Sequence, residues 1–524
     1  MPQRPPGGSG TIPALARSLT VRALVMALVA IAIVPASASA LPGARVAASK
    51  LVKHVEYPGT QHLRYAYGPI EILPGQNNIE ARVNRNKPTV PGFITRFNPN
   101  LVYSGGRKIP RVDVIHLHHG VWLNKGYPTF AAGEEKTIMQ FPRGYGYRYD
   151  PGDSWIMNYM IHNLTPKPTK VSITYDVDFV PDSSATAKKL TEARPLWMDV
   201  SGISAYPVFD AMKGQGRRGK FTFPNQASPS QQDDVGRARE FVARRDMTLL
   251  NTAGHLHPGG LWTDLKATRR GRTKRLFRSE AKYFEPAGAV SWDVSMTHTK
   301  PDWRVALKAG DRLNVSATYD TRNASWYESM GIMVVFYAEG TSDEAKDPFA
   351  SKTDWHGLLT HGHLPENRHH GGKARPRLPD ARRLPDGVFS ADLRIKGFSY
   401  ERGNLLLAGQ RGRPPLVRAG QSITFTNLDA VTTMSAQESA YHTITSCKAP
   451  CTGTTGIAYP LADAKVQFDS GELGYGPPGF TPAANRNTWQ TPRNLKAGTY
   501  TYFCRIHPFM RGAFRVVPKG KQQG

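Results

Sequence analysis

Alternation of apolar and polar residues is the feature that most restricts the fold of this chain. The segment "VSITYDVDFV" at 171–180 alternates almost without a break, and "RLNVSATYD" at 312–320 does the same. A period of two is that of a strand with one buried face. Long amphipathic helical patterns are scarce, whereas 49 Gly and 41 Pro provide many turns. The sequence therefore predicts an all-β protein, with two antiparallel sandwiches in series before residue 343.

The N-terminal segment has the pattern of a secretory signal. Arg17 and Arg22 precede the apolar run "ALVMALVAIAIV", and "PASASA" follows and ends at Ala40. We expect cleavage after Ala40 and export to the cell envelope or beyond. The run is too short to span a bilayer, which needs about 20 residues, although a retained anchor is the alternative. No other apolar run is that long, so we expect no stable membrane span after cleavage.

The charge balance is strongly basic. Lys and Arg number 68 and Asp and Glu 41, so the formal net charge is 68 − 41 = +27. The charges are scattered along the chain, and nothing resembles a nucleic-acid-binding module. This distribution favours a solvated basic surface, and we expect no nucleic-acid partner.

The three cysteines all lie in the last fifth of the chain. Cys447 and Cys451 in "CKAPC" form a candidate local disulfide, with a second metal site or free thiols as alternatives. Cys504 is then left alone in "TYFCRIHPFMRG", three residues before His507 and six before Met510. A thiolate, two imidazoles and a weak thioether make a trigonal copper site. The second imidazole is expected from an earlier strand.

That second imidazole is predicted to be His442, in the alternating stretch "SAYHTITSC". The set His442, Cys504, His507 and Met510 resembles the cupredoxins, and the loop "CRIHPFM" is most similar to that of amicyanin. The resemblance covers about 388–517 and implies a Greek-key β-sandwich with one type 1 blue copper that transfers single electrons.

Paired histidines mark the first 340 residues. In "VDVIHLHHGVW", His118 and His119 are adjacent, so on an ideal strand they point to opposite faces. One metal could take both only at a strand end or a bulge. In "TAGHLHPGG", His255 and His257 share one strand face and form a natural chelate. His162 in "WIMNYMIHNL" is a lone histidine in an apolar strand.

These pieces, in this order, resemble the copper type II, ascorbate-dependent monooxygenases, which include peptidylglycine α-hydroxylating and dopamine β-monooxygenases. That family has a His-His pair, a single strand His, a His-x-His and then a Met. Met330 in "SWYESMGIMVVFYAEG" follows His257 by 73 residues, and Met333 is the competing ligand. The resemblance covers about 50–340 and implies tandem jelly-roll sandwiches.

The resemblance also implies two type 2 coppers in addition to the blue one. His118, His119 and His162 would hold an electron-storing copper in the first sandwich. A second, catalytic copper would be held by His255, His257 and Met330 and would activate O₂ for C–H hydroxylation. Two imidazoles and a thioether favour Cu(I), the form that meets O₂. The implied partners are O₂, an unknown small-molecule or peptide substrate, and an external electron donor.

The chain departs from the peptide-hydroxylating members at three positions. Those members carry an Arg two residues before the His-x-His, where Ala253 stands here, and an Asn and a Tyr after the Met, where Ile332 and Val334 stand. Since these groups hold the peptide carboxylate in that family, their absence argues against a peptidylglycine substrate.

The predicted organisation has five parts. They are a signal peptide (1–40), a first copper-binding sandwich (41–205), a second one (206–342), a linker (343–387) and a cupredoxin (388–518). The linker is rich in Pro, Arg and His, which favours a flexible tether or a copper-scavenging tract. A tethered cupredoxin would raise the local concentration of electron donor for the upstream coppers. The alternatives are a copper-binding electron carrier without hydroxylase activity and a structural envelope protein with degenerate sites.

Overall fold

The computed structural model describes residues 51–72, 79–112, 114–163, 168–200, 208–228, 240–284, 292–322, 325–362, 378–430, 442–447, 449, 467–471, 473–475, 486–504 and 510–522. The chain divides into two compact units, residues 1–46 and 47–524, and every described residue belongs to the second unit. Strands dominate it, with short 3₁₀ turns at η1 (Ala187–Lys189) and η4 (Gly409–Gly412). The predicted all-β class is confirmed. The predicted signal peptide lies outside the described residues. Within the described residues, no helix has the length and apolar character needed to cross a membrane.

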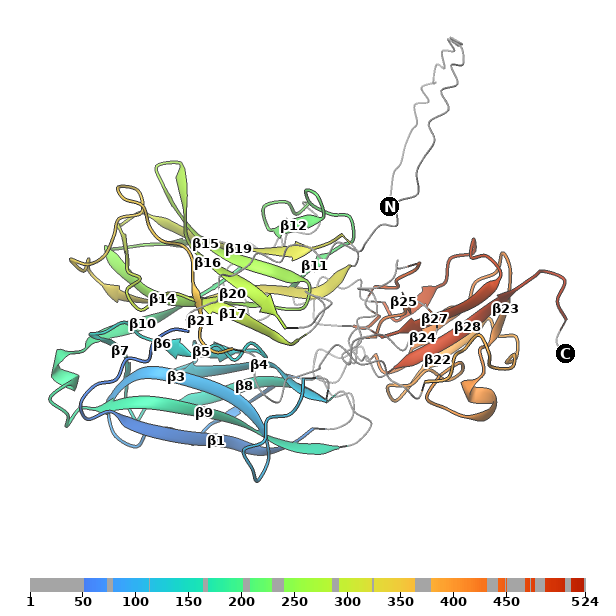
Figure 1. The fold of residues 1–524 in the computed structure, drawn as a ribbon, viewed down its shortest axis with the longest axis horizontal. Helices are drawn as coiled ribbons and strands as arrows, with labels where there is room; N and C mark the ends of the chain where they lie inside the picture. Colours follow the sequence, from blue (N-terminus) through green and yellow to red (C-terminus); the bar gives the residue numbers. More distant parts are fainter. Residues whose placement is uncertain are drawn as a thin grey trace, which may run out of the picture. The chain divides into compact units, whose positions relative to one another are not determined.

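The first sandwich consists of two sheets (Figure 1). One sheet contains β1 (Gln61–Ile72), β9 (Thr169–Pro181), β3 (Gly92–Tyr103), β7 (Tyr145–Tyr149) and β6 (Met139–Gln140). The other has the order β2 (Glu80–Val83), β8 (Trp155–Asn163), β4 (Ile115–Asn124) and β5 (Tyr127–Ala132). The alternating segment 171–180 lies in β9, whose odd-numbered apolar residues from Val171 to Phe179 are fully buried in the core.

Two further sheets pack as a second sandwich. One contains β10 (Thr191–Asp199), β20 (Trp326–Glu339), β14 (Met247–Leu256), β17 (Val294–His298), β18 (Val305–Leu307), β21 (Leu358–Leu359) and, beside the start of β20, β11 (Val208–Ala211). The other contains β12 (Lys220–Phe223), β13 (Phe241–Val242), β19 (Arg312–Asp320), β15 (Gly260–Arg269) and β16 (Arg272–Tyr283). The second alternating segment forms β19, as its pattern predicts.

Strands β10 and β20 join the two sandwiches. The first residues of β10 pair in parallel with β7, and the rest pair antiparallel with β20. Along β20 the side chains alternate between two cores. Met330 and Ile332 face the core shared with the first sandwich, whereas Met333 and Val335 face the core of the second. The domain boundary that the sequence predicts after residue 205 therefore comes after β10, a strand that belongs to both sandwiches.

The segment expected to be a flexible tether is docked where the structure describes its first part. Asp347 forms an ion pair with Arg269 at 2.7 Å, and β21 pairs with the end of β17. The Thr360 hydroxyl accepts a hydrogen bond from the backbone N–H of Ile138 at 3.0 Å. The tether interpretation is thus wrong for residues up to 362. Three of the five linker histidines, at 363, 369 and 370, lie outside the described residues.

The C-terminal region contains two small sheets around a core of its own. One has the order β22 (Asp392–Ile395), β24 (Thr424–Asn427) and β26 (Thr488–Gln490), and the other β23 (Leu416–Arg418), β28 (Arg511–Val517), β27 (Gly498–Phe503) and β25 (Thr445–Cys447). Cys504 directly follows β27, so a strand leads into the predicted ligand loop.

Candidate metal centres

A β-bulge in β4 positions the adjacent histidines. The pairing of β4 with β8 shifts between Leu117 and His119, so His118 is the extra residue. Before the bulge the odd positions Ile115 and Leu117 face the core, and after it the even position Trp122 does. The shift brings His119 back to the face that carries His118. Of the two arrangements expected for the His-His pair, a strand end or a bulge, the structure has the bulge.

On β14 and just beyond it, His255 and His257 lie on one face, with ring centroids 5.3 Å apart. Tyr319 fixes this end of the strand against β20. Its buried hydroxyl donates to the Met330 carbonyl at 2.7 Å and accepts from the backbone N–H groups of His257 and Met330 at 3.1 and 3.0 Å. One side chain thus ties together the backbones of two predicted ligands.

Four histidines gather around Trp292. The ring of His118 lies 4.4 Å from that of His257 and 4.9 Å from that of His162. His116, to which the sequence assigned no role, stacks on Trp292 at 4.7 Å, and its Nε2 is 2.9 Å from Nδ1 of His162. The two predicted copper sites are therefore contiguous, because His118 of the first lies as near His257 of the second as it does its own partners.

Burial favours the neutral form of three neighbouring imidazoles, those of His116, His118 and His119. It lowers the pKa of His116 and of His118 well below the ordinary 6.5, and neighbouring histidine rings add to the effect. Burial also lowers the pKa of His119 to about 4, although its hydrogen bond to Asn158 opposes the change. Neutral imidazole is the form that binds a metal.

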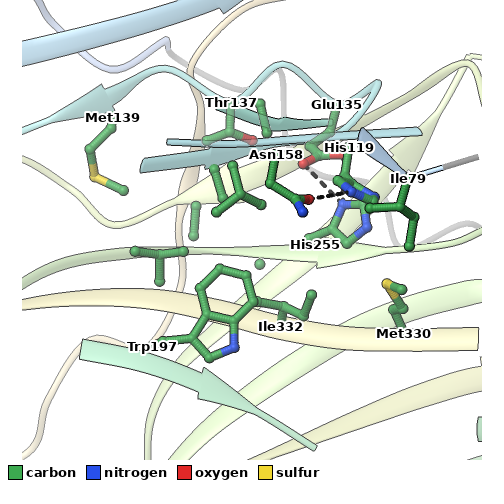
Figure 2. A pocket seen from close by; sticks show the side chains of 16 residues that line it. Ile79, His119, Glu135, Thr137, Met139, Asn158, Trp197, His255, Met330 and Ile332 are labelled. Carbon is green, nitrogen blue, oxygen red and sulfur yellow. Dashed lines mark hydrogen bonds and ion pairs between the residues drawn. The ribbon is translucent and has the colours of Figure 1, made fainter. Parts of the chain in front are cut away.

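A pocket of about 100 Å³ adjoins this cluster, and His119, His255 and Met330 all line it (Figure 2). Each histidine in the pocket is oriented by a polar neighbour. His119 Nε2 is 2.9 Å from Asn158 Oδ1, which can only accept, so the N–H is on Nε2 and Nδ1 presents a lone pair. His255 Nδ1 donates to the Glu135 carboxylate, at 3.1 Å from both oxygens.

The Glu135 carboxylate is buried beside His255. Burial raises the pKa of this carboxyl, but His255 and the backbone N–H of Gly133 outweigh that effect and hold the pKa below its ordinary value. Gly133 leaves room for the pair, since a Cβ there would lie 2.5 Å from both Glu135 Oε2 and His255 Cε1. A carboxylate behind an imidazole is the usual support of a metal-binding histidine.

Copper fits these donors. Within the described part of the chain, no group of three or more His, Cys, Asp or Glu side chains stands in a geometry that could hold a metal as it is. Individual donor atoms are nevertheless available to a metal, since Nε2 of His255 is buried without a hydrogen-bond partner. Nδ1 of His118 and Nδ1 of His119 are 3.3 Å apart. Two nitrogens at about 2.0 Å from one metal, at a tetrahedral angle, would be separated by about 3.3 Å.

The C-terminal donors also fit a metal. His442, Cys504 and Met510 are buried, and Cys504 Sγ lies 3.8 Å from His442 Nδ1. Metal bonds of about 2.3 Å to sulfur and 2.0 Å to nitrogen in a trigonal plane would set these atoms about 3.7 Å apart. His442 Nε2 lies 3.0 Å from an Asp429 oxygen. His507 lies outside the described residues.

Two contacts hold the imidazole and the sulfur of this centre. Burial lowers the pKa of His442, but Asp429 and Cys504 outweigh it and hold the pKa above its ordinary value. The backbone N–H of Thr443 donates to Cys504 Sγ at 3.4 Å. Such a bond favours a thiolate, the ligand form of cysteine. Cys447 is disulfide-bonded, and Cys451, its predicted partner, lies outside the described residues.

The two candidate methionine ligands face different parts of the structure, and the three positions that differ from the peptide-hydroxylating enzymes lie together. Met330 projects toward the pocket, whereas Met333 faces the core of the second sandwich. Ala253, Ile332 and Val334 all line the pocket. Other pocket and cluster residues escaped the sequence reasoning: His116, Glu135, Asn158 and Trp292. The only signal for them was the nearness of His116 to the His-His pair, because the others come from distant strands and loops.

One curated relative of this chain has a name that agrees with copper chemistry. No family model matches the chain. A protein of Phoma sp. (strain ATCC 20986 / MF5453), "Probable copper-dependent oxygenase M1", is 22% identical over 311 residues, which cover 54% of this chain and 73% of that protein. Among solved structures, a purple cupredoxin from Nitrosopumilus maritimus is 18% identical and covers 24% of this chain and 100% of its own, with a TM-score of 0.15.

A second solved structure, a mutant amicyanin in the Cu(I) form, is 19% identical and covers 28% of this chain and 99% of its own, with a TM-score of 0.14. At such TM-scores neither structure bears on the function. The chain is thus a distant relative of a protein named as a copper-dependent oxygenase.

Proposed function

We propose that this protein is an exported copper-dependent oxygenase that hydroxylates a C–H bond, with its C-terminal cupredoxin-like region supplying electrons. The observation that carries the proposal is the pocket, where His119, His255 and Met330 meet an apolar cavity. The name of the distant relative supports it. The reaction balances as RH + O₂ + 2 e⁻ + 2 H⁺ → ROH + H₂O, with both electrons drawn from an external one-electron reductant.

Copper bound at these histidines would supply the redox chemistry with O₂. The protein's own residues do the rest. Glu135 and Asn158 fix the ring orientations of His255 and His119, so the remaining nitrogens stay available as ligands. The apolar side chains that line the pocket, such as Val121, keep water away from the reacting group. In the C-terminal region, Thr443 and Asp429 hold the sulfur and imidazole of the electron-transfer centre.

A copper-binding electron carrier without hydroxylase activity is the second candidate. It is favoured by the apolar side chains at Ala253, Ile332 and Val334, where the peptide-hydroxylating enzymes that this chain resembles hold a carboxylate. Under this candidate, copper would still bind at His255 and Cys504, but no substrate would stimulate O₂ consumption.

The deciding experiment measures copper content, optical spectra and EPR on the full chain and on His255→Ala and Cys504→Ala. We expect three coppers, one blue and two colourless. His255→Ala should lose only a colourless one, and Cys504→Ala only the blue one. A single blue copper that persists in His255→Ala would refute the oxygenase proposal. O₂ uptake with ascorbate then separates the candidates, because only the oxygenase shows uptake that a substrate stimulates.

A further inference from the structure

The walls of the pocket beside His119 and His255 are mainly apolar. Of its 16 lining residues, ten carry apolar side chains: Ile79, Val121, Ala131, Ala132, Met139, Trp197, Ala253, Met330, Ile332 and Val334. These come from both sandwiches and leave a volume of about 100 Å³. An apolar cavity of about 150 Å³ holds benzene, which has six carbon atoms, so this smaller pocket suits a group of about four or five carbon atoms.

The polar side chains that line the pocket are largely committed to the histidines. The Glu135 carboxylate accepts from His255 and from the backbone N–H of Gly133, at 2.7 Å for the latter. Asn158 Oδ1 accepts from His119. The Thr137 hydroxyl oxygen differs, since it is buried without a hydrogen-bond partner. It is a neutral group that can donate to, or accept from, a bound hydroxyl or carbonyl.

The charges around the pocket disfavour an anion. No Lys or Arg is among its described lining residues, and the one carboxylate there is that of Glu135. Lys136 lies between the lining residues Glu135 and Thr137 in the sequence, but it is buried and forms an ion pair with Glu134 at 2.8 Å, so its charge is already neutralised. In the copper-free protein, a carboxylate placed in this pocket would lose its hydration without gaining a cation, which is unfavourable.

We infer that this pocket takes a neutral, compact apolar substrate group of about four or five carbons, with at most one hydroxyl or carbonyl facing Thr137, and that its walls reject carboxylates. This inference rests on the proposed function in one respect only: it takes the apolar group in the pocket to be the part of the substrate that lies beside His119 and His255. The binding preference itself follows from the pocket walls, whichever reaction occurs there.

The test is binding of three probes that share one ring: cyclopentanol, cyclopentanecarboxylate and cyclopentylamine. Binding is measured by saturation-transfer NMR and calorimetry on the full chain in its copper-free form, where the pocket walls alone decide the preference. We expect cyclopentanol to bind at least tenfold more tightly than either charged probe. Equal or tighter binding of the carboxylate or the amine, or no binding of cyclopentanol, would overturn the inference.

Matched variants locate the binding. Ala253→Leu fills the pocket and should weaken cyclopentanol binding at least tenfold, whereas Ala309→Leu, at an exposed position, should leave it unchanged. Thr137→Val, nearly equal in volume, should weaken cyclopentanol severalfold but leave cyclopentane binding unchanged. Thermal unfolding checks that each variant folds. Cyclopentanol binding that Ala253→Leu does not weaken would refute the location.

The copper-free binding measurement separates this inference from the proposed function. If the copper-free protein binds the neutral probe selectively but the protein does not take up three coppers when copper is supplied, the oxygenase is refuted and the pocket assignment stands. Three coppers with substrate-stimulated O₂ uptake, but tighter binding of the carboxylate, would refute the pocket assignment alone.

Discussion

Replacing Gly133 by Ala tests whether Glu135 and His255 form one metal-supporting unit. The added Cβ would lie 2.5 Å from Glu135 Oε2 and from His255 Cε1, and 2.8 Å from His255 Nδ1. Ordinary contacts begin at 3.4 Å, so the side chains must move apart by about 3.4 − 2.5 = 0.9 Å. Metal–ligand distances tolerate only about 0.2 Å. We therefore expect copper affinity at His255 to fall about 10- to 100-fold, or about 1.4–2.7 kcal/mol.

The assay is competition with a copper chelator, followed by EPR of the colourless signals and by the optical spectrum of the blue centre. The matched control is Gly106→Ala, whose Cβ would come no nearer than 3.9 Å to another atom and should change nothing. Overpacking also costs about 1–3 kcal/mol of folding stability, which thermal unfolding should reveal. If Gly133→Ala bound copper as tightly as Gly106→Ala, or lost the blue signal as well, the reasoning about this contact would be wrong.

Three further predictions follow from named contacts. Glu135→Gln keeps an acceptor for His255 but removes the charge, so chelator competition should show copper affinity lower by about tenfold at that site and unchanged at the blue centre. Tyr319→Phe removes the hydroxyl that ties His257 to Met330, and urea unfolding should show a loss of about 1–3 kcal/mol. Burial lowers the pKa of His298 from 6.5 to about 4, so below pH 6.5 the unfolded chain takes up a proton that the folded chain does not. The free energy of unfolding of the copper-free protein should therefore decrease as the pH is lowered from 6.5 to 4. Between about pH 7.5 and about pH 5, His298→Gln should lose about 2 kcal/mol less of this free energy than the unchanged protein does. Equal losses in the two proteins would contradict this.

The strand content and much of the candidate site could be predicted because they depend on local patterns. Segment 171–180 became β9 because a period of two has one stable outcome, a strand with one buried face. The adjacency of His118 and His119 likewise required a strand end or a bulge if one metal was to take both, and β4 has a bulge there. The assignment of residues 343–362 to a tether failed because polar composition does not reveal partners such as Arg269, which lies on a distant strand.

The sequence by itself determined the chemistry available: which side chains can be ligands, and which of them share a strand face or a loop. Period-two geometry gives that information within a single strand. Only the tertiary structure decided that His118 meets His257, that Glu135 supports His255, and that Met330 rather than Met333 faces the pocket. Those choices depend on which strands of the two sandwiches face each other. Contacts between residues 120 or more positions apart, such as Glu135 with His255, arise from the packing of whole sheets, which no local pattern encodes.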